Sequence, residues 1–448
     1  MNYELLKSAI ENEAKLQGLT EYEIYYMADE ELSVDTLNNA QNSFSSGNGG
    51  GICFRVLYEG KMGYAASELM DEEEMKSLVS RAKANALATE KPDTVGIFAG
   101  SESYAELKNN GYSLKSAAEL KKLAIDMANT LHQASDKVTG GTVTAGVTAG
   151  FTIRLSNSHG LDLETKCGIN LLQAMAVIND NGKFENAYDM KELKDEEIDL
   201  AEMAKGIVDE AVLKANAVTV ESGKYSVVLS AKQMRTILSV YSSAFSGKMA
   251  QMGMSLLAGK EGEQIAADIV NITDDPMREG VSIQTNFDAE GVAAFRKSIV
   301  EAGVLKTLLH NRETAAAAGV DSTGNGSKGS YASPVGISPY AFCLEAGEHT
   351  EDELFAMVGN GIYITELKGL HAGANAVTGD FSLESAGFKI VDGKKGEAIK
   401  SFTIAGNFFE LIKSIAALSN KVEVAVTGGF TTFGAPAVLI HNVSVAGQ

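Results

Sequence analysis

The chain has 448 residues, of which 45% are hydrophobic and 22% charged, so it can bury large cores and lacks the composition of a disordered protein. Its 38 basic and 59 acidic residues give a formal net charge of −21. Because no run of basic residues offsets this charge, the sequence argues against direct contact with nucleic acid and favours a well-solvated surface.

The first block, residues 1–90, is predicted to run from a helix through strands to a second helix. An amphipathic opening helix is followed by residues 21–39, whose polar and apolar side chains alternate as in paired strands. The segment SFSSGNGGG, residues 43–51, is predicted to form a flexible turn region. Two further strands then flank a tight turn at Glu59-Gly60, and the acidic start of residues 71–88 is typical of a helix N-terminus.

The second block is predicted to span residues 112–218, after an irregular linker. A helix is expected to begin at Ser113 as its N-cap. A long alternating stretch from Val138 to about Tyr188 indicates a β-meander, and a helix from about Asp195 to Ala217 closes the block. Two turns are predicted to interrupt the meander, at residues 157–160 and 179–182.

The third block, residues 222–448, is predicted to be rich in short strands and glycine-containing turns. A buried strand at Tyr225–Leu229 precedes an apolar stripe at helical spacing, and a late helix is expected at about Phe408 to Leu418. The stripe consists of Met234, Ile237, Leu238, Tyr241 and Phe245. Together the three blocks predict an α+β fold with large, mostly antiparallel sheets and flanking helices.

The three cysteines, Cys53, Cys167 and Cys343, are far apart and form no CxxC pair, which argues against a disulfide framework or a zinc knuckle. The acidic, amphipathic N-terminus is unlike a signal peptide, and no run of about eighteen apolar residues suggests a membrane span. We therefore expect a cytoplasmic protein that contacts no membrane.

Motifs for common catalytic sites are absent from the sequence. It contains no GxxxxGK[ST] phosphate loop, no HExxH zinc helix and no GxSxG elbow, and no two of its six histidines are spaced to form a metal pair. The glycine-rich loop 321–336 could hold an anion through backbone amides, with charge from Lys328, although a plain surface loop is the alternative interpretation.

Residues 369–390 form the other informative run. Polar side chains lie here among small residues, which let an extended peptide approach the backbone closely. The polar residues are His371, Asn375, Thr378, Asp380, Ser382 and Glu384. A β-hairpin arch without a ligand is the alternative interpretation.

Eight segments in order resemble the TldD/PmbA family, also called the modulator of DNA gyrase family, over nearly the whole chain. The two most specific are GIYITELKGLHAGANAVTGDFSLESAGFKIVDGK and FTIAGNFFELIKSIAALSN, residues 361–394 and 402–420. The others are residues 51–67, 157–166, 227–238, 272–276, 288–292 and 322–334. The resemblance implies a zinc peptidase built from two related subunits.

In the catalytic, TldD-type subunit, the resemblance implies a His-Glu-x-x-x-His motif after the strand that matches Tyr225–Leu229 and a cysteine near the C-terminus. Two imidazoles and a thiolate would hold zinc, and the glutamate would act as general base. Histidines five residues apart point in different directions on a straight helix, so a local distortion must bring them together. In this chain the matching segment is Ser239–Ala244, which keeps none of these residues, and the C-terminal stretch has no cysteine.

The chain thus resembles the TldE/PmbA-type subunit. We expect no catalytic residue and no metal ligand in it, with zinc on a TldD-like partner. The resemblance implies a heterodimer around a chamber for unfolded peptides, or a homodimer in isolation. The candidate peptide-binding residues are Gly373, Asn375, Thr378, Gly379 and Asp380. Two alternatives remain: a protein-binding modulator of DNA gyrase and a stand-alone, metal-independent hydrolase.

Overall fold

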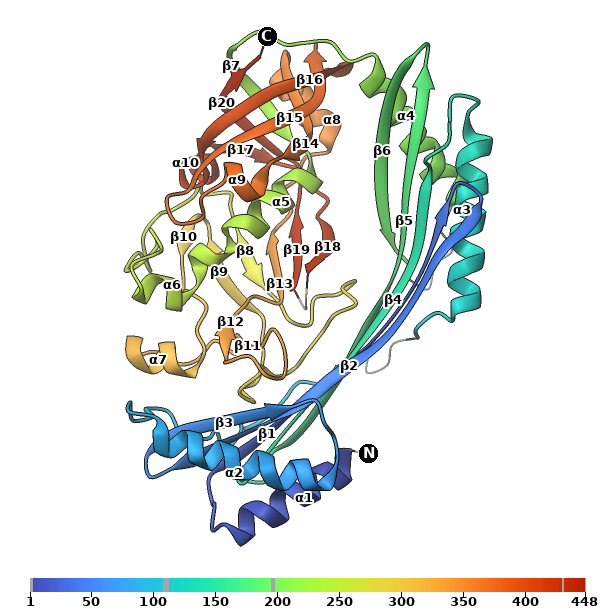
Figure 1. Ribbon diagram of the computed structural model, residues 1–448. Coiled ribbons are helices and arrows are strands. Elements are labelled where there is room, and N and C mark those ends of the chain that lie inside the picture. The colour runs from blue at the N-terminus through green and yellow to red at the C-terminus, as the bar shows by residue number, and fades with distance from the viewer. Residues whose placement is uncertain (1–2, 108–112, 195–197, 429–430, 448) are drawn as a thin grey trace.

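The N-terminal half of the chain builds one long antiparallel sheet with strand order β3-β2-β1-β4-β5-β6. The computed structural model describes residues 3–107, 113–194, 198–428 and 431–447. Figure 1 shows the sheet as a twisted band that curves along one side of the C-terminal region. Its strands are β1 (Tyr22–Leu37), β2 (Ala40–Tyr58), β3 (Lys61–Ser67), β4 (Val143–Asn157), β5 (Asp162–Asp180) and β6 (Lys183–Glu192).

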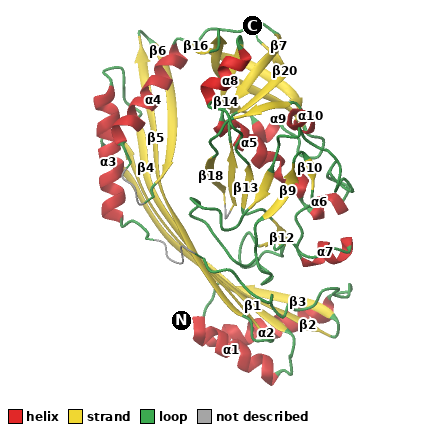
Figure 2. Cartoon of the chain, turned by 180° about the vertical axis from the view of Figure 1, so that it is seen from behind, coloured by secondary structure: helices red, strands yellow, loops and turns green. Residues whose placement is uncertain are grey.

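Helices cover the sheet at both of its ends (Figure 2). At one end lie α1 (Tyr3–Leu16) and α2 (Glu72–Ala88), and at the other lie α3 (Ala117–Ala134) and α4 (Leu200–Ala215). Each pair closes its own core because its apolar side chains recur at helical spacing. The first core includes Leu6, Ile10, Phe54, Met75 and Leu78, and the second includes Met127, Leu131, Leu172, Ile207 and Val208.

The sheet joins the two blocks predicted at residues 1–90 and 112–218. Strand β1 of the first block pairs with β4 of the second from Glu23↔Asn157 to Leu37↔Val143. The blocks keep separate helical covers and separate cores but share one continuous hydrogen-bonded ladder. The turns predicted at residues 157–160 and 179–182 lie where β4 meets β5 and where β5 meets β6.

The prediction of a flexible turn at residues 43–51 was wrong. These residues belong to β2 and pair with β1, and the chain reverses earlier, at Asn38, which has a φ of 55°. Glycine and serine have low strand propensity, but the ladder with β1 satisfies their main chain. Gly49 also has a local reason to be glycine, because a Cβ there would lie 2.8 Å from the Asp29 carboxylate.

Two helix boundaries also differ from the sequence prediction. The N-cap of α3 is Ser116, which forms a capping box with Glu119, whereas the carbonyl of Ser113 accepts from Asn170. The helix expected at 408–418 ends early, because α10 (Phe408–Lys413) gives way to strand β17 (Ile415–Leu418), which pairs with β20 (Val438–Ala446). Part of the predicted start of α4, residues 195–197, lies outside the described residues.

The C-terminal region contains a closed barrel. Strands β7 (Gly223–Leu229), β14 (Gly361–Lys368), β15 (Asp380–Val391), β16 (Lys394–Asn407) and β20 follow one another around it, and the pairing of β16 with β20 closes the ring. Helix α8 (Glu351–Val358) packs on the barrel, and α9 (Leu370–Gly373) lies in the connection from β14 to β15.

A second sheet of the C-terminal region has strand order β10-β9-β8-β13-β19-β18. Helix α5 (Ala231–Tyr241) packs against both sheets and buries the predicted stripe, which is confirmed as part of the largest core. The α+β class with large antiparallel sheets is confirmed as well. The strands are β8 (Ile272–Asp274), β9 (Lys297–Glu301), β10 (Val304–Leu305), β13 (Ala341–Leu344), β18 (Glu423–Gly428) and β19 (Thr431–Ala435), with a separate pair β11 (Gly326–Ser327) and β12 (Gly336–Ile337).

A glycine in β3 allows α2 to pack closely on the sheet, which gives a test of the fold. A Cβ at Gly63 would lie 2.2 Å from the carbonyl oxygen of Ala82, a backbone atom that cannot move aside cheaply. We expect Gly63→Ala to lower the free energy of unfolding by about 1–3 kcal/mol, measured by urea denaturation. The matched control is Gly206→Ala on the exposed face of α4, where a Cβ meets nothing within 4 Å and should raise stability by up to about 1 kcal/mol. Equal effects of the two substitutions would contradict this packing.

Candidate functional site

The segment that the family resemblance aligns with the metal motif lies at the end of α5. After Tyr241 the helix tightens into the 3₁₀ turn η1 (Ser242–Phe245), and the short helix α6 (Gly247–Gln251) follows. The distortion that two histidines five residues apart would require is therefore present here. The hydroxyls of Ser239 and Ser242 donate to the carbonyls of Thr236 and Ser239, each at 2.8 Å, so both serve the helix backbone.

Within the described parts of the chain, no group of three or more His, Cys, Asp or Glu side chains lies close enough to hold a metal ion. The buried histidine near this turn is His310, whose ring lies so close to Gly247 that a Cβ there would be 2.3 Å away. Its Nδ1 is 3.2 Å from the Thr314 hydroxyl, and burial lowers the pKa of the ring. The donor set at this position therefore does not fit a zinc ion.

The candidate peptide-binding residues form one compact loop between α9 and β15, which we call the arch, residues 373–380. The Asn375 side-chain oxygen accepts from the backbone N–H groups of Val377 at 2.9 Å and Thr378 at 3.3 Å. Asn407 donates to the Thr378 carbonyl at 2.8 Å and to the Asp380 carboxylate at 3.0 Å. Many polar groups of the arch thus form hydrogen bonds that stabilise the arch itself.

The arch also touches the end of α5. The hydroxyl of Tyr241 donates to the carbonyl of Asp380 at 2.9 Å, while its ring stacks on Phe408 with centroids 4.5 Å apart. Burial raises the pKa of Tyr241 to about 12, so the hydroxyl stays protonated as a donor. Gly373 and Gly379 allow close packing, because a Cβ would lie 2.3 Å from the Ser382 carbonyl or 2.6 Å from the Phe409 ring. The structure thus brings the candidate residues together, directly beside the motif position.

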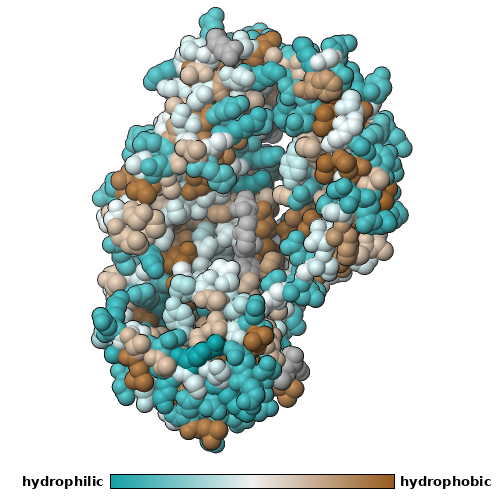
Figure 3. Space-filling model, viewed as in Figure 1, coloured by the Kyte–Doolittle hydropathy of each residue, from teal (hydrophilic) through white to brown (hydrophobic). Residues whose placement is uncertain are grey.

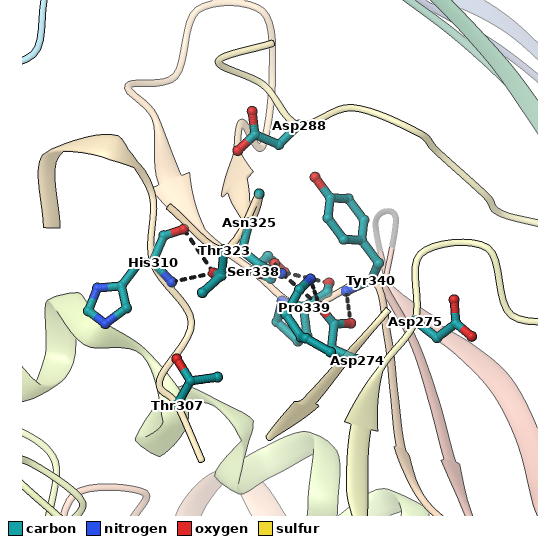
Figure 4. A network of polar contacts seen from close by, with 12 residues as sticks. Asp274, Asp275, Asp288, Thr307, His310, Thr323, Asn325, Ser338, Pro339 and Tyr340 are labelled. Carbon is teal, nitrogen blue, oxygen red and sulfur yellow. Dashed lines mark hydrogen bonds and ion pairs between the residues drawn. The ribbon is translucent and has the colours of Figure 1, made fainter. Parts of the chain in front are cut away.

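A buried polar network organises the other sequence-predicted loop, residues 321–336 (Figure 4). Asp274 is fully buried, and its carboxylate accepts from the Asn325 amide at 2.7 Å, the Tyr340 backbone at 2.8 Å and the Lys297 ammonium at 3.2 Å. Thr323 donates to the side chain of Asn325 at 2.8 Å. The sequence prediction singled out this loop because of its glycines, but it did not identify the buried Asn325 as the residue that anchors the loop.

The tip of the same loop reaches the long sheet. A Cβ at Gly51 in β2 would lie 2.5 Å from the ring of Tyr331, and the ammonium of Lys328 lies 4.9 Å from the centroid of the Tyr25 ring. Beside this contact is a mostly apolar cavity of about 240 Å³ that Asp288 and Tyr340 also line. Burial raises the pKa of Asp288 to about 7, although its oxygens accept three backbone hydrogen bonds. The loop is therefore one of the contacts between the long sheet and the C-terminal region.

A wider opening, which we call the crevice, separates the long sheet from α5 and β18. Its volume is about 340 Å³, and its walls come from β5 and β6 on one side and from α5 and the segment 421–426 on the other. Figure 3 shows this face of the molecule hollowed between the two regions. The sequence prediction missed the crevice, because its walls come from three separate stretches of the chain, within residues 169–192, 232–235 and 421–426.

Comparison with known protein families identifies the chain. A family model described as the PmbA/TldA metallopeptidase C-terminal domain matches residues 222–447, and one described as PmbA/TldA metallopeptidase domain 1 matches residues 22–86. The chain belongs to the TldD/PmbA metallopeptidase family.

Relatives of known sequence support this assignment. An uncharacterized protein of Methanocaldococcus jannaschii is 31% identical over 90% of this chain and 92% of its own length. The metalloprotease PmbA of Escherichia coli O157:H7 is 25% identical over 72% of this chain and 70% of its own length.

Solved structures share the fold over nearly the whole chain. A protein of Thermotoga maritima, described as a candidate modulator of a DNA gyrase, has a TM-score of 0.88 and 28% identity, and covers 99% of this chain and 100% of its own. TldE from Thermococcus kodakarensis has a TM-score of 0.85 with 23% identity, and covers 98% of this chain and 100% of its own.

In the described residues of this TldD/PmbA family member, we find no helix with the length and apolar character that crossing a membrane requires.

The buried network around Asp274 should dominate the stability of the C-terminal region. Lys297→Met removes the cation that pairs with a carboxylate of 0% exposure, and we expect it to lower the free energy of unfolding by about 3–5 kcal/mol in urea denaturation. The matched control is Lys306→Met, whose ion pair with Glu301 is 3.3 Å long and solvent-exposed, with an expected change within about 0.5 kcal/mol. A Lys297→Met protein as stable as the control would show that Asp274 does not depend on the ion pair.

Proposed function

We propose that this chain is the non-metal, TldE/PmbA-type subunit of a cytosolic zinc metallopeptidase and that it holds unfolded peptides for a TldD-like catalytic subunit. The observation that carries the proposal is the motif position itself. Ser239, Val240 and Ala244 stand where the catalytic type has His, Glu and His, and serine hydroxyls and alkyl groups do not replace imidazoles as zinc ligands. The backbone distortion at η1 persists without the metal chemistry.

The arch and the crevice support a peptide-holding role. Extended peptides bind to exposed strand edges through main-chain hydrogen bonds, which place few demands on the peptide's sequence. Here β18 is the last strand of its sheet and borders the crevice, while the arch lies against the other end of α5. A TldD-like partner would supply the zinc-bound water that cleaves the peptide, and this chain would supply part of the chamber wall.

The proposal is tested by metal content, complex formation and peptidase activity. We expect the purified chain alone to contain almost no zinc and to cleave no unfolded peptide, whereas its TldD-like partner should carry roughly one zinc per subunit. Mixing the two should produce a heterodimer in size-exclusion chromatography with light scattering and raise the rate of peptide cleavage. The partner mixed with bovine serum albumin, another acidic protein, controls for nonspecific effects.

Two outcomes would overturn the proposal. Stoichiometric zinc held by this chain would contradict its non-metal role. The absence of a complex together with unchanged cleavage would remove the peptidase role, and salt-sensitive association with DNA gyrase alone would then favour the modulator alternative that the description of the Thermotoga maritima protein suggests.

The arch can be tested within the same complex. Asn375→Ala removes the oxygen that accepts from Val377 and Thr378, so we expect the arch to loosen and the KM for peptide to rise about fivefold with kcat unchanged, equivalent to about 1 kcal/mol. Asn375→Asp keeps an acceptor oxygen in the same place and should retain the wild-type KM. A wild-type KM in the alanine variant would show that the arch does not hold peptide.

A further inference from the structure

In the part of the chain that the structure describes, the crevice is bordered by two strands that each lack a neighbour on one side. Strand β18 ends its sheet and pairs with β19, and β6 ends the long sheet and pairs with β5. Such edges present unpaired backbone N–H and C=O groups that can bind an added strand. The side of the crevice formed by the long sheet is partly apolar, with Ile169, Leu171 and Met190.

Three cationic side chains line the α5 and β18 side of the crevice: Lys232, Arg235 and Lys421. Within the described parts of the chain, none of the three forms an ion pair, because no carboxylate oxygen lies within 4.0 Å of their nitrogen atoms. In a protein of net charge −21, three unpaired cations on one wall are an unusual concentration of positive charge.

The acidic residues of the crevice do not neutralise these cations by contact. Asp189 is paired with Lys191 at 3.5 Å, and Glu192 accepts a hydrogen bond from Ser282. Glu423 lies close enough to raise the pKa of Arg235 through space, but burial outweighs it and the pKa of this guanidinium is lowered. Arg235 therefore faces the crevice without a direct partner.

The guanidinium of Arg235 also contains an unsatisfied donor. Its Nε is buried and has no hydrogen-bond partner among the residues that the structure describes. A buried donor in this condition costs about 1–3 kcal/mol, and more when charged, so such groups are rare unless a ligand satisfies them. A carboxylate in the crevice suits Arg235, because the planar guanidinium of an arginine binds carboxylates through two parallel hydrogen bonds.

We infer that the crevice binds an extended peptide along the free edge of β18 and that Arg235 selects an aspartate or glutamate side chain of that peptide. Main-chain pairing with β18 would place every second side chain of the peptide on the same face of the extended sheet. Lys232, one turn before Arg235 on α5, and Lys421, at the start of the β18 segment, add attraction for acidic residues. This inference rests on the proposed peptide-holding function and adds to it a preference for acidic peptides.

The test uses the full chain and two peptides that differ in one group. Both are acetylated and amidated, are about eight residues long and alternate valine with threonine around a central residue that is glutamate in one and glutamine in the other. We expect fluorescence anisotropy to give about tenfold tighter binding of the glutamate peptide, a difference of about 1.4 kcal/mol. Raising the salt concentration should reduce this ratio, because the added attraction is electrostatic.

Variants then assign the preference to Arg235. Arg235→Met, which keeps a long apolar stem without the charge, should bring the ratio of the two affinities close to one and leave binding of the glutamine peptide unchanged. Arg235→Lys should keep part of the preference. The matched control is Arg81→Met on α2, outside the crevice, where the ratio should stay at its wild-type value.

Thermal denaturation separates this role from a structural one. Because Arg235 has a buried donor without a partner, Arg235→Met should leave Tm unchanged or raise it, whereas a structural arginine would lower Tm on replacement. A lower Tm in this variant would count against the inference. Tighter binding of the glutamate peptide should also raise the wild-type Tm more than the glutamine peptide does.

Several results would overturn the inference. These are equal binding of the two peptides or a preference that survives Arg235→Met. In each case the proposed subunit function stands if the heterodimer forms and stimulates cleavage. If neither peptide binds and no heterodimer forms, the inference and the proposed function both fail.

Discussion

The buried carboxylate of Asp274 is the point on which the arrangement of the C-terminal region depends. It joins β8, where it lies, to β9 through Lys297, to the glycine-rich loop through Asn325 and to the start of β13 through the Tyr340 backbone. An unpaired charge at 0% exposure would be very costly, so these three donors must meet in one geometry. That requirement fixes the loop, and the loop's Tyr331 contacts β2 of the long sheet. The spacing of the two regions therefore follows in part from a single carboxylate.

Patterns within short stretches of sequence predicted those elements that are stabilised by residues close to them in the chain. The apolar stripe on α5 and the Glu59-Gly60 turn depend on neighbouring residues, and both are observed. Residues 43–51 form a strand although their glycines and serines have low strand propensity. Pairing with β1 holds this strand, and Gly49 leaves room for the Asp29 side chain. The choice between Ser113 and Ser116 as the cap of α3 depended on one reciprocal contact with Glu119.

The two candidate sites differed in how far the sequence could predict them. The sequence alone shows that the segment Ser239–Ala244 lacks the His and Glu residues of the catalytic type. Metal binding depends on the residue types at a few positions, and these can be read without a structure. The arch was predicted as a peptide-binding segment from its small and polar residues, and in the structure its Asn375 accepts hydrogen bonds from the loop itself. The crevice had no local signal, since Arg235 and Ile169 belong to different halves of the chain and its walls form only when the halves pack together.

Helix α5 connects the segment Ser239–Ala244 with the crevice. Arg235 and Ser239 are four residues apart on it, so they lie on the same face, roughly 6 Å apart between Cβ atoms. The positive charge of the Arg235 guanidinium repels a divalent cation, and partial burial weakens the screening of this repulsion by water. Under the proposed function, this repulsion would add to the effect of the missing imidazoles at Ser239 and Ala244. The same positive charge attracts carboxylates, so the proposed non-metal role and the inferred preference for acidic peptides would both depend on one face of α5.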